Sequence, residues 1–519
     1  MMAYGAELPP QMFNMTRYCL APQTQRPADK IALVVISDPT DLEPAETWTY
    51  GALEDCALRI AAGLETLGLE RGDRLVIRLD NTSDYALLFF GAIAGGFVPL
   101  PASAALSARE VSFFVANCGA KAIARNETLP VGELPADVLV LDENQVAALK
   151  TGPVRADYAD TAANDPAFLV YTSGTSTQPK GVLHAHRSAW GRRPMYQGWY
   201  GIGPDDRMLH AGAFNWTFTL GVGLTDPWAN GATTVIYNGP RDVGVWPRII
   251  EKHHITLFAA VPGVYRQILK YCDFETGAMA TLRHGLIAGE RLPAGLAEDW
   301  SARTRTPFYE ALGMSEISTY ISSSPTVPPR AGAIGKAQEG RDIAILPLEA
   351  GQGALPADEV GLIAIHRSDP GLMLGYWDRA DEEAQVFRGD WFLTGDLGSR
   401  DADGYISHHG RADDLMNALG YRVSPNEIEQ VLSAHPDIAE IAAAEIQVRP
   451  DLNVIGAFVV AREGASPSPD SVRSFAEQRL ASYKVPREYV FIDALPRNPN
   501  GKVLRSQLSQ FYRAPGSHG

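Results

Sequence analysis

The sequence predicts an α/β protein with a large N-terminal domain and a small C-terminal domain. The chain has 519 residues, more than one hydrophobic core usually holds, so two or more domains are expected. Up to about residue 290, short apolar runs alternate with helical runs of about ten residues, which is typical of parallel α/β sheets. From about residue 410 the chain becomes a compact mixture of short strands and helices. We therefore expect stacked α/β sheets and a β-rich subdomain, followed by a small, mobile α+β domain.

The first part of the chain is expected to contain two successive sets of strands and helices. Strands are predicted at 31–37, 73–79, 120–124, 138–141 and 167–170, and helices at 51–67, 86–97 and 107–117. The run 86–97 is too apolar for anything but a buried helix. Residues 142–164 are expected to form a loop.

The same alternation of strands and helices continues, and then the composition changes to short strands and more glycine. Strands are predicted at 233–237, 255–260 and 286–288, and helices after His186, at 246–253 and from Gly263. Glycine and short strands in 344–377 indicate the β-rich subdomain. Helices at 425–434 and 470–481, with strands at 454–461 and 489–492, make the C-terminal unit. We place the boundary at the Gly410–Arg411 step, which gives domains of residues 1–409 and 410–519.

The composition describes an ordinary globular protein and excludes some functions. There are 45 basic and 61 acidic residues, a net charge of −16, which argues against a general nucleic-acid or anionic-membrane binder. Four scattered cysteines without a CxxC pattern indicate reduced thiols in a cytoplasmic protein and no metal-ligand set. We identify no signal peptide and no clean membrane span.

One loop carries the composition of a phosphate-binding site. Residues 171–182 read Tyr-Thr-Ser-Gly-Thr-Ser-Thr-Gln-Pro-Lys-Gly-Val. Small residues leave backbone N–H groups open, hydroxyls add donors, and the lysine adds a positive charge, which together suit a polyphosphate. The loop is not that of a P-loop NTPase, because Pro179 and Gly181 flank Lys180. On composition alone a solvated linker remains the alternative.

Five further clusters follow in the chain, at 286–293, 308–316, 391–396, 410–429 and 495–505. The second ends in Gly-x-Ser-Glu, and the third is expected to be a strand that ends in a tight turn with an exposed aspartate. Singly, each has an ordinary interpretation: Asp396 as a turn or capping residue, Glu316 as a helix-start carboxylate, and Asp413–Asp414 as a solvated pair. In this order and spacing they cease to be independent.

Together these motifs resemble the adenylate-forming superfamily, which contains acyl-CoA synthetases, luciferase-type enzymes and peptide-synthetase adenylation domains. The resemblance runs from about residue 12 to 508. Residues 13–20 (Phe-Asn-Met-Thr-Arg-Tyr-Cys-Leu) and 482–486 (Ser-Tyr-Lys-Val-Pro) are most similar to the branch of benzoate-CoA ligases and medium-chain acyl-CoA synthetases.

The resemblance implies a binding site for ATP. The β- and γ-phosphates would be held by Thr172, Ser173, Gly174, Thr175, Ser176, Thr177 and Lys180. The adenine slot would be lined by Gly289, Glu290, Glu310, Ala311 and Leu312. Asp396 would bind the ribose hydroxyls, and Arg411 the ribose or a phosphate.

The resemblance also implies the catalytic residues. Glu316 would hold Mg²⁺, Ser315 would lie near the α-phosphate, and Lys502 would serve the first half-reaction. There a carboxylate attacks the α-phosphorus of ATP, and cations must offset the repulsion between two anions. Rotation about Asp413 would then replace Lys502 by the loop Gly420–Tyr421, so that the thiolate of CoA can attack the acyl adenylate.

Two positions depart from the usual pattern. Thr177 stands where the family loop has glycine, and Leu312 stands where an aromatic residue often stacks on adenine. We expect ATP binding to survive, because Lys180 and the rest of the loop are present. An aliphatic residue at 312 slightly favours the benzoate-type branch.

The acid that is activated would lie against Phe214, Trp216 and Gly313. Clustered aromatic residues suit a small aromatic or a short- to medium-chain acid, although plain core packing is the alternative. The partners implied are that acid, ATP and CoA, and a homodimer is left open. Two other functions remain: an acyl-adenylate enzyme with a carrier-protein or amine acceptor, and a non-catalytic nucleotide-binding relative.

Overall fold

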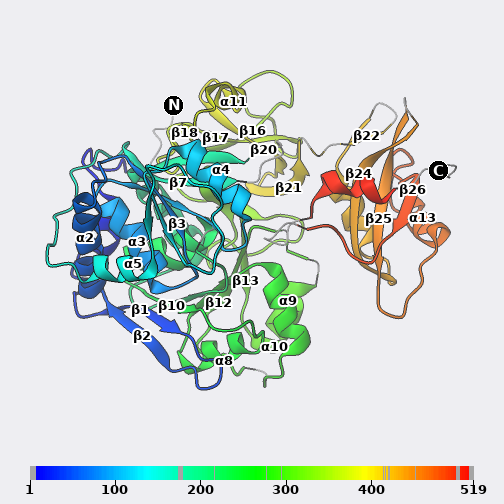
Figure 1. Cartoon of the computed structure of the whole chain (residues 1–519). Coiled ribbons are helices and arrows are strands. Elements are labelled where there is room, and N and C mark those ends of the chain that lie inside the picture. The colour runs from blue at the N-terminus through cyan, green and yellow to red at the C-terminus, as the bar shows by residue number, and fades with distance from the viewer. Residues whose placement is uncertain are drawn as a thin grey trace. The chain divides into compact units, whose positions relative to one another are not determined.

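The computed structural model describes residues 7–512 except 173–178, 215–216, 276, 291, 294, 413, 415, 419–420, 450–451 and 498–502. The chain forms two compact units (Figure 1). The first holds residues 1–343 and 365–392, and the second holds 344–364 and 393–519. The predicted class is confirmed: both sheets and helices are present, with a large N-terminal unit and a small C-terminal one. The predicted boundary at residue 410 stays a prediction about where the C-terminal domain begins.

The N-terminal part of the first unit is a parallel sheet of four strands in the order β4-β3-β5-β6. Its strands and helices are β3 (Arg74–Arg78), β4 (Val98–Pro101), β5 (Ala122–Arg125), β6 (Leu139–Leu141), α2 (Tyr50–Thr66), α3 (Ser83–Ala94), α4 (Ala108–Cys118) and α5 (Glu143–Lys150). Helices α2, α3 and α5 pack together (Figure 1). Because side chains alternate along a strand, Leu75 and Ile77 pack into the α2–α3 core, while Val76 packs with α4.

A second, longer sheet supports the site. In this unit its order is β15-β14-β13-β12-β11-β9-β10-β1-β2. The strands are β1 (Ile31–Ile36), β2 (Pro44–Thr49), β9 (Arg207–His210), β10 (Thr233–Tyr237), β11 (Leu257–Ala260), β12 (His284–Ala288), β13 (Phe308–Met314), β14 (Ser318–Ser322) and β15 (Gly335–Ala337). The strands from β1 to β13 are parallel, and β2, β14 and β15 pair antiparallel at the two ends.

The two faces of this sheet pack against different elements. One face carries α8 (Val245–Lys252), α9 (Pro262–Tyr271) and α10 (Leu296–Thr304). The other packs against the single-turn π-helix η3 (Tyr196–Tyr200), with Phe218 and Val222 from the segment of η4 (Thr219–Thr225), also a π-helix. Short helical turns complete this side: α1 (Met15–Leu20), η1 (His186–Ser188), η2 (Trp190–Arg192), α6 (Arg193–Met195) and α7 (Asp226–Ala229).

A third sheet has three antiparallel strands in the order β18-β8-β7. They are β7 (Pro166–Thr172), β8 (Lys180–Ala185) and β18 (Gly375–Tyr376). The predicted phosphate loop is therefore the connection of a hairpin. The unit ends with α11 (Ala380–Gln385) and β19 (Phe387–Arg388), which pairs with the first residues of β20 (Trp391–Arg400).

The second unit combines a small sheet with a compact α+β fold. Strands β16 (Ile343–Leu346), β17 (Gly361–His366), β20 and β21 (Tyr405–Arg411) lie in that order. Next come the hairpin β22 (Met416–Ala418) and β23 (Tyr421–Val423), and the sheet β24 (Ile438–Arg449), β25 (Leu452–Ala461) and β26 (Glu488–Phe491). Helices α12 (Pro425–Leu432) and α13 (Pro469–Glu477) and the 3-10 helix η5 (Arg505–Phe511) accompany them.

Two expectations about local structure are wrong. Residues 142–164 are not all loop, because Asp142 caps α5 through a capping box with Gln145. The strand at Trp391 does not end in a tight turn at Asp396 but continues to Arg400, paired with β21. Among the described helices, none is long and apolar enough to cross a membrane.

Candidate active site

A tight connection between β13 and β14 presents Ser315 and Glu316. The antiparallel pairing shifts register at Leu312/Gly313, and Ser318 takes a positive φ of 86°. A Cβ on Gly313 would lie 2.6 Å from the carbonyl oxygen of Ser318, so only glycine allows the two chains to approach this closely. The sequence Gly-Met-Ser-Glu thus specifies the turn as well as the side chains it carries.

The Glu316 carboxylate is buried and oriented by a distant tyrosine. Glu316 is only 9% exposed. The Tyr376 hydroxyl donates a hydrogen bond of 2.8 Å to Oε1 of Glu316. The Met373 N–H donates to the Glu316 carbonyl at 2.8 Å, which fixes the backbone of the turn to the segment before β18. A carboxylate oxygen is a ligand that Mg²⁺ prefers, so Glu316 fits the role of metal ligand.

Lys180 begins β8 and lies beside the same tyrosine. Thr172 and Lys180 are paired across the hairpin at the two ends of the predicted phosphate loop. The Lys180 ammonium is 5.4 Å from the centre of the Tyr376 ring and forms an ion pair with Glu382 of α11. Tyr376 therefore joins the proposed phosphate lysine to the proposed metal ligand.

The residues predicted to line the adenine slot share one edge of the long sheet. Strands β12 and β13 are parallel, with Ala288 opposite Ala311. Gly289 therefore follows the end of β12, and Leu312 lies within β13, two residues before its end. Ligands usually lie beyond the carboxyl ends of the strands in such sheets. Gly289 has a φ of 89°. The Glu310 carboxylate accepts a hydrogen bond of 3.1 Å from the N–H of Leu292, which ties the segment after Glu290 to β13.

In the second unit, Asp396 and Arg411 lie opposite each other on β20 and β21. Asp396 is buried, with its Oδ1 3.8 Å from an Arg411 nitrogen and 3.2 Å from Nε2 of His408. Arg411 also donates to the Thr394 carbonyl at 2.7 Å. The structure thus brings the two predicted ribose residues together.

Several predicted residues lie outside the described ranges: Ser173, Gly174, Thr175, Ser176, Thr177, Trp216, Asp413, Gly420 and Lys502. Tyr421 begins β23. Their roles stay predictions.

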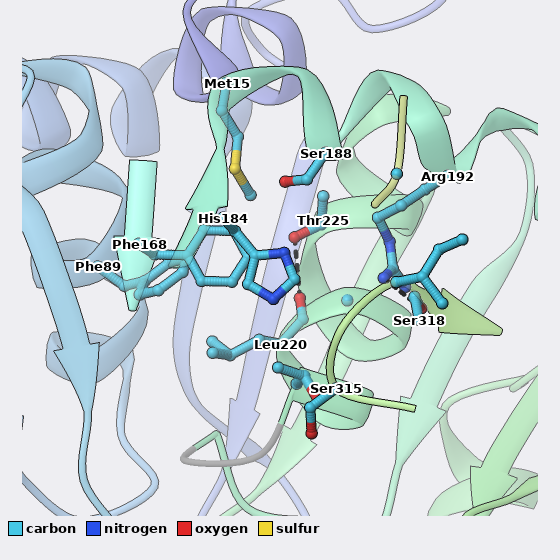
Figure 2. Close-up of a pocket in the computed structure, with 14 residues that line it drawn as sticks. Met15, Phe89, Phe168, His184, Ser188, Arg192, Leu220, Thr225, Ser315 and Ser318 are labelled. Atoms are coloured by element: carbon cyan, nitrogen blue, oxygen red, sulfur yellow. Dashed lines mark hydrogen bonds between the residues drawn. The ribbon is translucent and has the colours of Figure 1, made fainter. Parts of the chain in front are cut away.

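A cavity opens beside Ser315 (Figure 2). Its cavity volume is about 30 Å³, and it is partly open to solvent, so a ligand larger than a water molecule or two needs the lining side chains to move apart. Thr217 and Gly221 contribute from the region next to the predicted acyl-pocket residue Trp216. Phe214 does not line this cavity; it is buried in the core, 6.0 Å from the Tyr85 ring, as the alternative interpretation expects. The described lining residues are Met15, Phe89, Phe168, His184, Ser188, Arg192, Thr217, Leu220, Gly221, Thr225, Ser315, Ile317, Ser318 and Gly371.

Arg192, which is held in a buried ion pair, forms part of one wall of the cavity. Arg192 donates to both carboxylate oxygens of Asp226 at 2.7 and 2.6 Å and to the Ser318 hydroxyl at 2.6 Å. The Tyr200 hydroxyl adds a bond of 2.7 Å to Asp226. Burial alone would lower the pKa of Arg192, but the charge and hydrogen bonds of Asp226 raise it above its usual value. The pair therefore stays charged and internally compensated.

Sequence reasoning missed Tyr376, Glu382, His408, His184 and the Arg192–Asp226 pair. Tyr376 lies 60 positions after Glu316, and Asp226 lies 34 positions after Arg192. Nothing in the local pattern marks any of them, because the surroundings of each are set only by the fold.

Comparison with protein families decides the broader identity. The model described as "AMP-binding enzyme" matches residues 20–377, and that described as "AMP-binding enzyme C-terminal domain" matches 427–502. The first match alone covers more than half of the chain. The chain belongs to the AMP-binding enzyme family.

Proteins similar to this AMP-binding enzyme include aromatic acid–CoA ligases. The 3-hydroxybenzoate–CoA ligase of Aromatoleum sp. (strain CIB) is 29% identical over 93% of this chain and 95% of its own length. The benzoate–CoA ligase of Thauera aromatica is 29% identical over 90% and 91%. A solved benzoate CoA ligase from Burkholderia xenovorans has a TM-score of 0.82 at 28% identity, covering 96% of this chain and 100% of the other.

Proposed function

We propose that this AMP-binding enzyme is an AMP-forming acid–CoA ligase that acts on a small aromatic or a short- to medium-chain acid. The observation that carries the proposal is the position of the Ser315–Glu316 turn. On one side Tyr376 connects it to Lys180 of the phosphate hairpin, and on the other it borders an enclosed cavity. A carboxylate held in that cavity would meet ATP at the turn.

The reaction has two steps. In the first, a carboxylate oxygen forms a bond to the α-phosphorus of ATP, the bond to the β-phosphate oxygen breaks, and pyrophosphate leaves. In the second, the thiolate of CoA forms a bond to the acyl carbon, the carbon–oxygen bond to the adenylate breaks, and AMP leaves.

The residues of the chain divide this work by charge. Lys180 would neutralise the departing phosphates, and removing one such group typically lowers the rate by about 10²–10³-fold. Glu316 would hold Mg²⁺, which when bound supplies a second positive charge to the phosphates. Asp396 and Arg411 are proposed to bind the ribose, and Gly289, Glu290 and Glu310–Leu312 the adenine. The free cysteines Cys19, Cys56, Cys118 and Cys272 support a reducing compartment, so we place the enzyme in the cytoplasm.

The decisive experiment measures pyrophosphate release with ATP and Mg²⁺ over a panel of carboxylic acids, with and without CoA. The panel spans acetate to decanoate, benzoate and its hydroxy and amino derivatives, and cyclohexane carboxylate. Steady turnover that needs CoA on one cluster of acids supports the proposal. A single turnover that CoA does not stimulate would indicate a carrier-protein or amine acceptor. No release with any acid would favour a non-catalytic nucleotide-binding protein.

The proposed domain movement gives a second test. We propose that the C-terminal domain begins at the Gly410–Arg411 step and turns about Asp413 between the two steps. Lys502→Ala is then expected to lower the rate of adenylation at least 10²-fold, while thioester formation from a supplied acyl adenylate continues. Rapid-quench assays of the separate half-reactions measure both. Equal loss of both steps would refute the exchange of Lys502 for the Gly420–Tyr421 loop.

A further inference from the structure

His184 is a buried histidine that lines the cavity and whose ring nitrogens make no hydrogen bond of normal geometry with the described residues. The residue lies in the middle of β8 and is only 4% exposed. Its ring stacks on Phe168, with centroids 4.5 Å apart and planes 12° from parallel. Within the described part of the chain neither Nδ1 nor Nε2 makes a hydrogen bond of normal geometry. A buried polar group without a partner destabilises the protein, so a ligand that hydrogen-bonds to this ring would bind more tightly than one that does not.

The cavity joins this imidazole to the reaction centre. Ser315, beside the proposed Mg²⁺ ligand, lines the same space as His184 (Figure 2). An acid whose carboxylate is activated at the turn must direct the rest of its structure into the cavity. There it meets Met15, Phe89, Phe168, Leu220 and Ile317 on apolar walls. Two aromatic rings and compact aliphatic groups suit a small, flat ring.

The charges around the cavity limit the second polar group that such an acid can carry. Burial lowers the pKa of His184 to about 3, only partly offset by the nearby Ser315 backbone, so the ring is neutral at ordinary pH. The Arg192 guanidinium is compensated by Asp226. Among the described residues that line the cavity, a second carboxylate would find no uncompensated cation and an ammonium group no uncompensated anion. A neutral group that both donates and accepts matches a neutral imidazole, which offers one N–H and one bare nitrogen.

We propose that the acid activated by this enzyme is a compact aromatic acid bearing a hydroxyl group, and that His184 binds that hydroxyl in the cavity. This inference rests on the proposed function and adds to it the substrate class and a residue that selects it. A site built to bind a hydroxyl discriminates strongly against the analogue that lacks it, because the buried partner is then left unsatisfied.

The test compares benzoate with 2-, 3- and 4-hydroxybenzoate in CoA-dependent turnover of the full-length enzyme. We expect kcat/KM for the best hydroxybenzoate to exceed that for benzoate by at least tenfold. His184→Phe keeps a flat ring on Phe168 but removes both nitrogens, so it is expected to lower the ratio of kcat/KM for the hydroxy acid to kcat/KM for benzoate at least tenfold. His184→Gln restores a donor and an acceptor and should recover part of the preference.

The matched control is His186→Asn. His186 is also buried, and its Nε2 makes no hydrogen bond to any residue that the structure describes, but it is not among the residues that line the cavity. Asparagine can keep the hydrogen bond that Nδ1 accepts from the Met15 N–H at 3.1 Å, so the preference for the hydroxy acid should be unchanged. If His184→Phe does not fold, as judged by circular dichroism, His184→Gln and the wild-type selectivity carry the test.

The outcomes separate the two proposals. Turnover of benzoate as fast as or faster than every hydroxybenzoate, or an unchanged preference in His184→Phe, overturns this inference and leaves the ligase proposal standing. If no acid supports CoA-dependent turnover, the proposed function itself fails, and calorimetric binding of the hydroxybenzoates to wild type and His184→Phe still tests the role of His184.

Discussion

At the scale of single residues, the main feature of the site is that Tyr376 contacts both Lys180 and Glu316. Its hydroxyl binds the Glu316 carboxylate, and its ring lies beside the Lys180 ammonium. Glu382 forms an ion pair with the same ammonium, and the hydrogen bond from Lys180 is the main cause that lowers the pKa of Glu382. In the proposed function, the phosphates of ATP would therefore compete with Glu382 for Lys180.

Replacing Glu382 should relieve this competition. Because the pair is partly exposed, it is worth only about 0.2–1 kcal/mol, so Glu382→Gln is expected to lower the KM for ATP up to about fivefold. Asp381→Asn, a neighbouring change of equal charge on α11, is the control and should have no such effect. Initial rates over a range of ATP concentrations measure both. A higher KM in Glu382→Gln would instead assign Glu382 to the orientation of Lys180.

At the scale of elements, the π-helix η4 allows Arg192 to reach its partners. A Cβ on Gly221 would lie 2.1 Å from Nη2 of Arg192 and 2.4 Å from its Cζ. An arginine side chain is normally flexible, but here Asp226 and Ser318 hold the guanidinium in place. Moving it away from an added Cβ would break these hydrogen bonds. Gly221 therefore makes room for the ion pair whose Arg192 forms part of one cavity wall.

Gly221→Ala is accordingly expected to destabilise the protein by about 2–4 kcal/mol, between the effects of overpacking and of a disrupted buried ion pair. Gly223→Ala lies in the same helix, but its Cβ would approach only to 3.2 Å of the His210 Cβ, and about 1 kcal/mol or less is expected. Urea unfolding of the two variants provides the comparison. Equal destabilisation would show that Arg192 can be displaced without loss.

The same scale shows which elements the sequence can predict. Strands of Val and Ile between turn residues, such as β10, were predicted to within a residue or two, because local preference and burial agree there. Strand β24 was not predicted: Ile438–Arg449 is rich in alanine and glutamate, which favour helices, and its pairing with β25 overrides that preference. Helix α5 was missed although its capping box at Asp142 and Gln145 stood in the sequence.

The candidate site divides in a similar way. Lys180, Glu316, Asp396 and Arg411 were predicted because they lie in motifs of recognisable order. The contacts that orient them come from Tyr376, Glu382 and His408, and the polar wall of the cavity from His184 and from Arg192, which Asp226 holds. These depend on contacts between distant segments, for which a single sequence carries no local signal.

At the scale of the whole molecule, buried neutral histidines link stability to pH. Burial lowers the pKa of His184 and His210 to about 3 and of His186 and His284 to about 4. In the unfolded chain each regains a pKa of about 6.5. The unfolded state therefore binds more protons below pH 6.5, and stability falls as the pH is lowered from there toward 4.

We expect the free energy of unfolding to fall between pH 6.5 and 5 by up to about 1.4 kcal/mol per pH unit for each of these histidines. Urea titrations at pH 7, 6 and 5 measure the slope, and His186→Asn should reduce it by the share of one histidine. Constant stability across this range would contradict the neutral, buried state of the four rings.

The burial of α3 has a consequence for synthesis of the chain. Eleven of its twelve residues are buried, yet Phe90 packs on Trp228, with ring centroids 4.9 Å apart. Roughly 140 residues separate the two, and a ribosome adds about 5–20 residues per second. For roughly 7–28 s α3 therefore lacks its contact with Trp228, while α1 and α2, made earlier, already cover other parts of it; that patch of apolar surface stays open until the later segment has been synthesised.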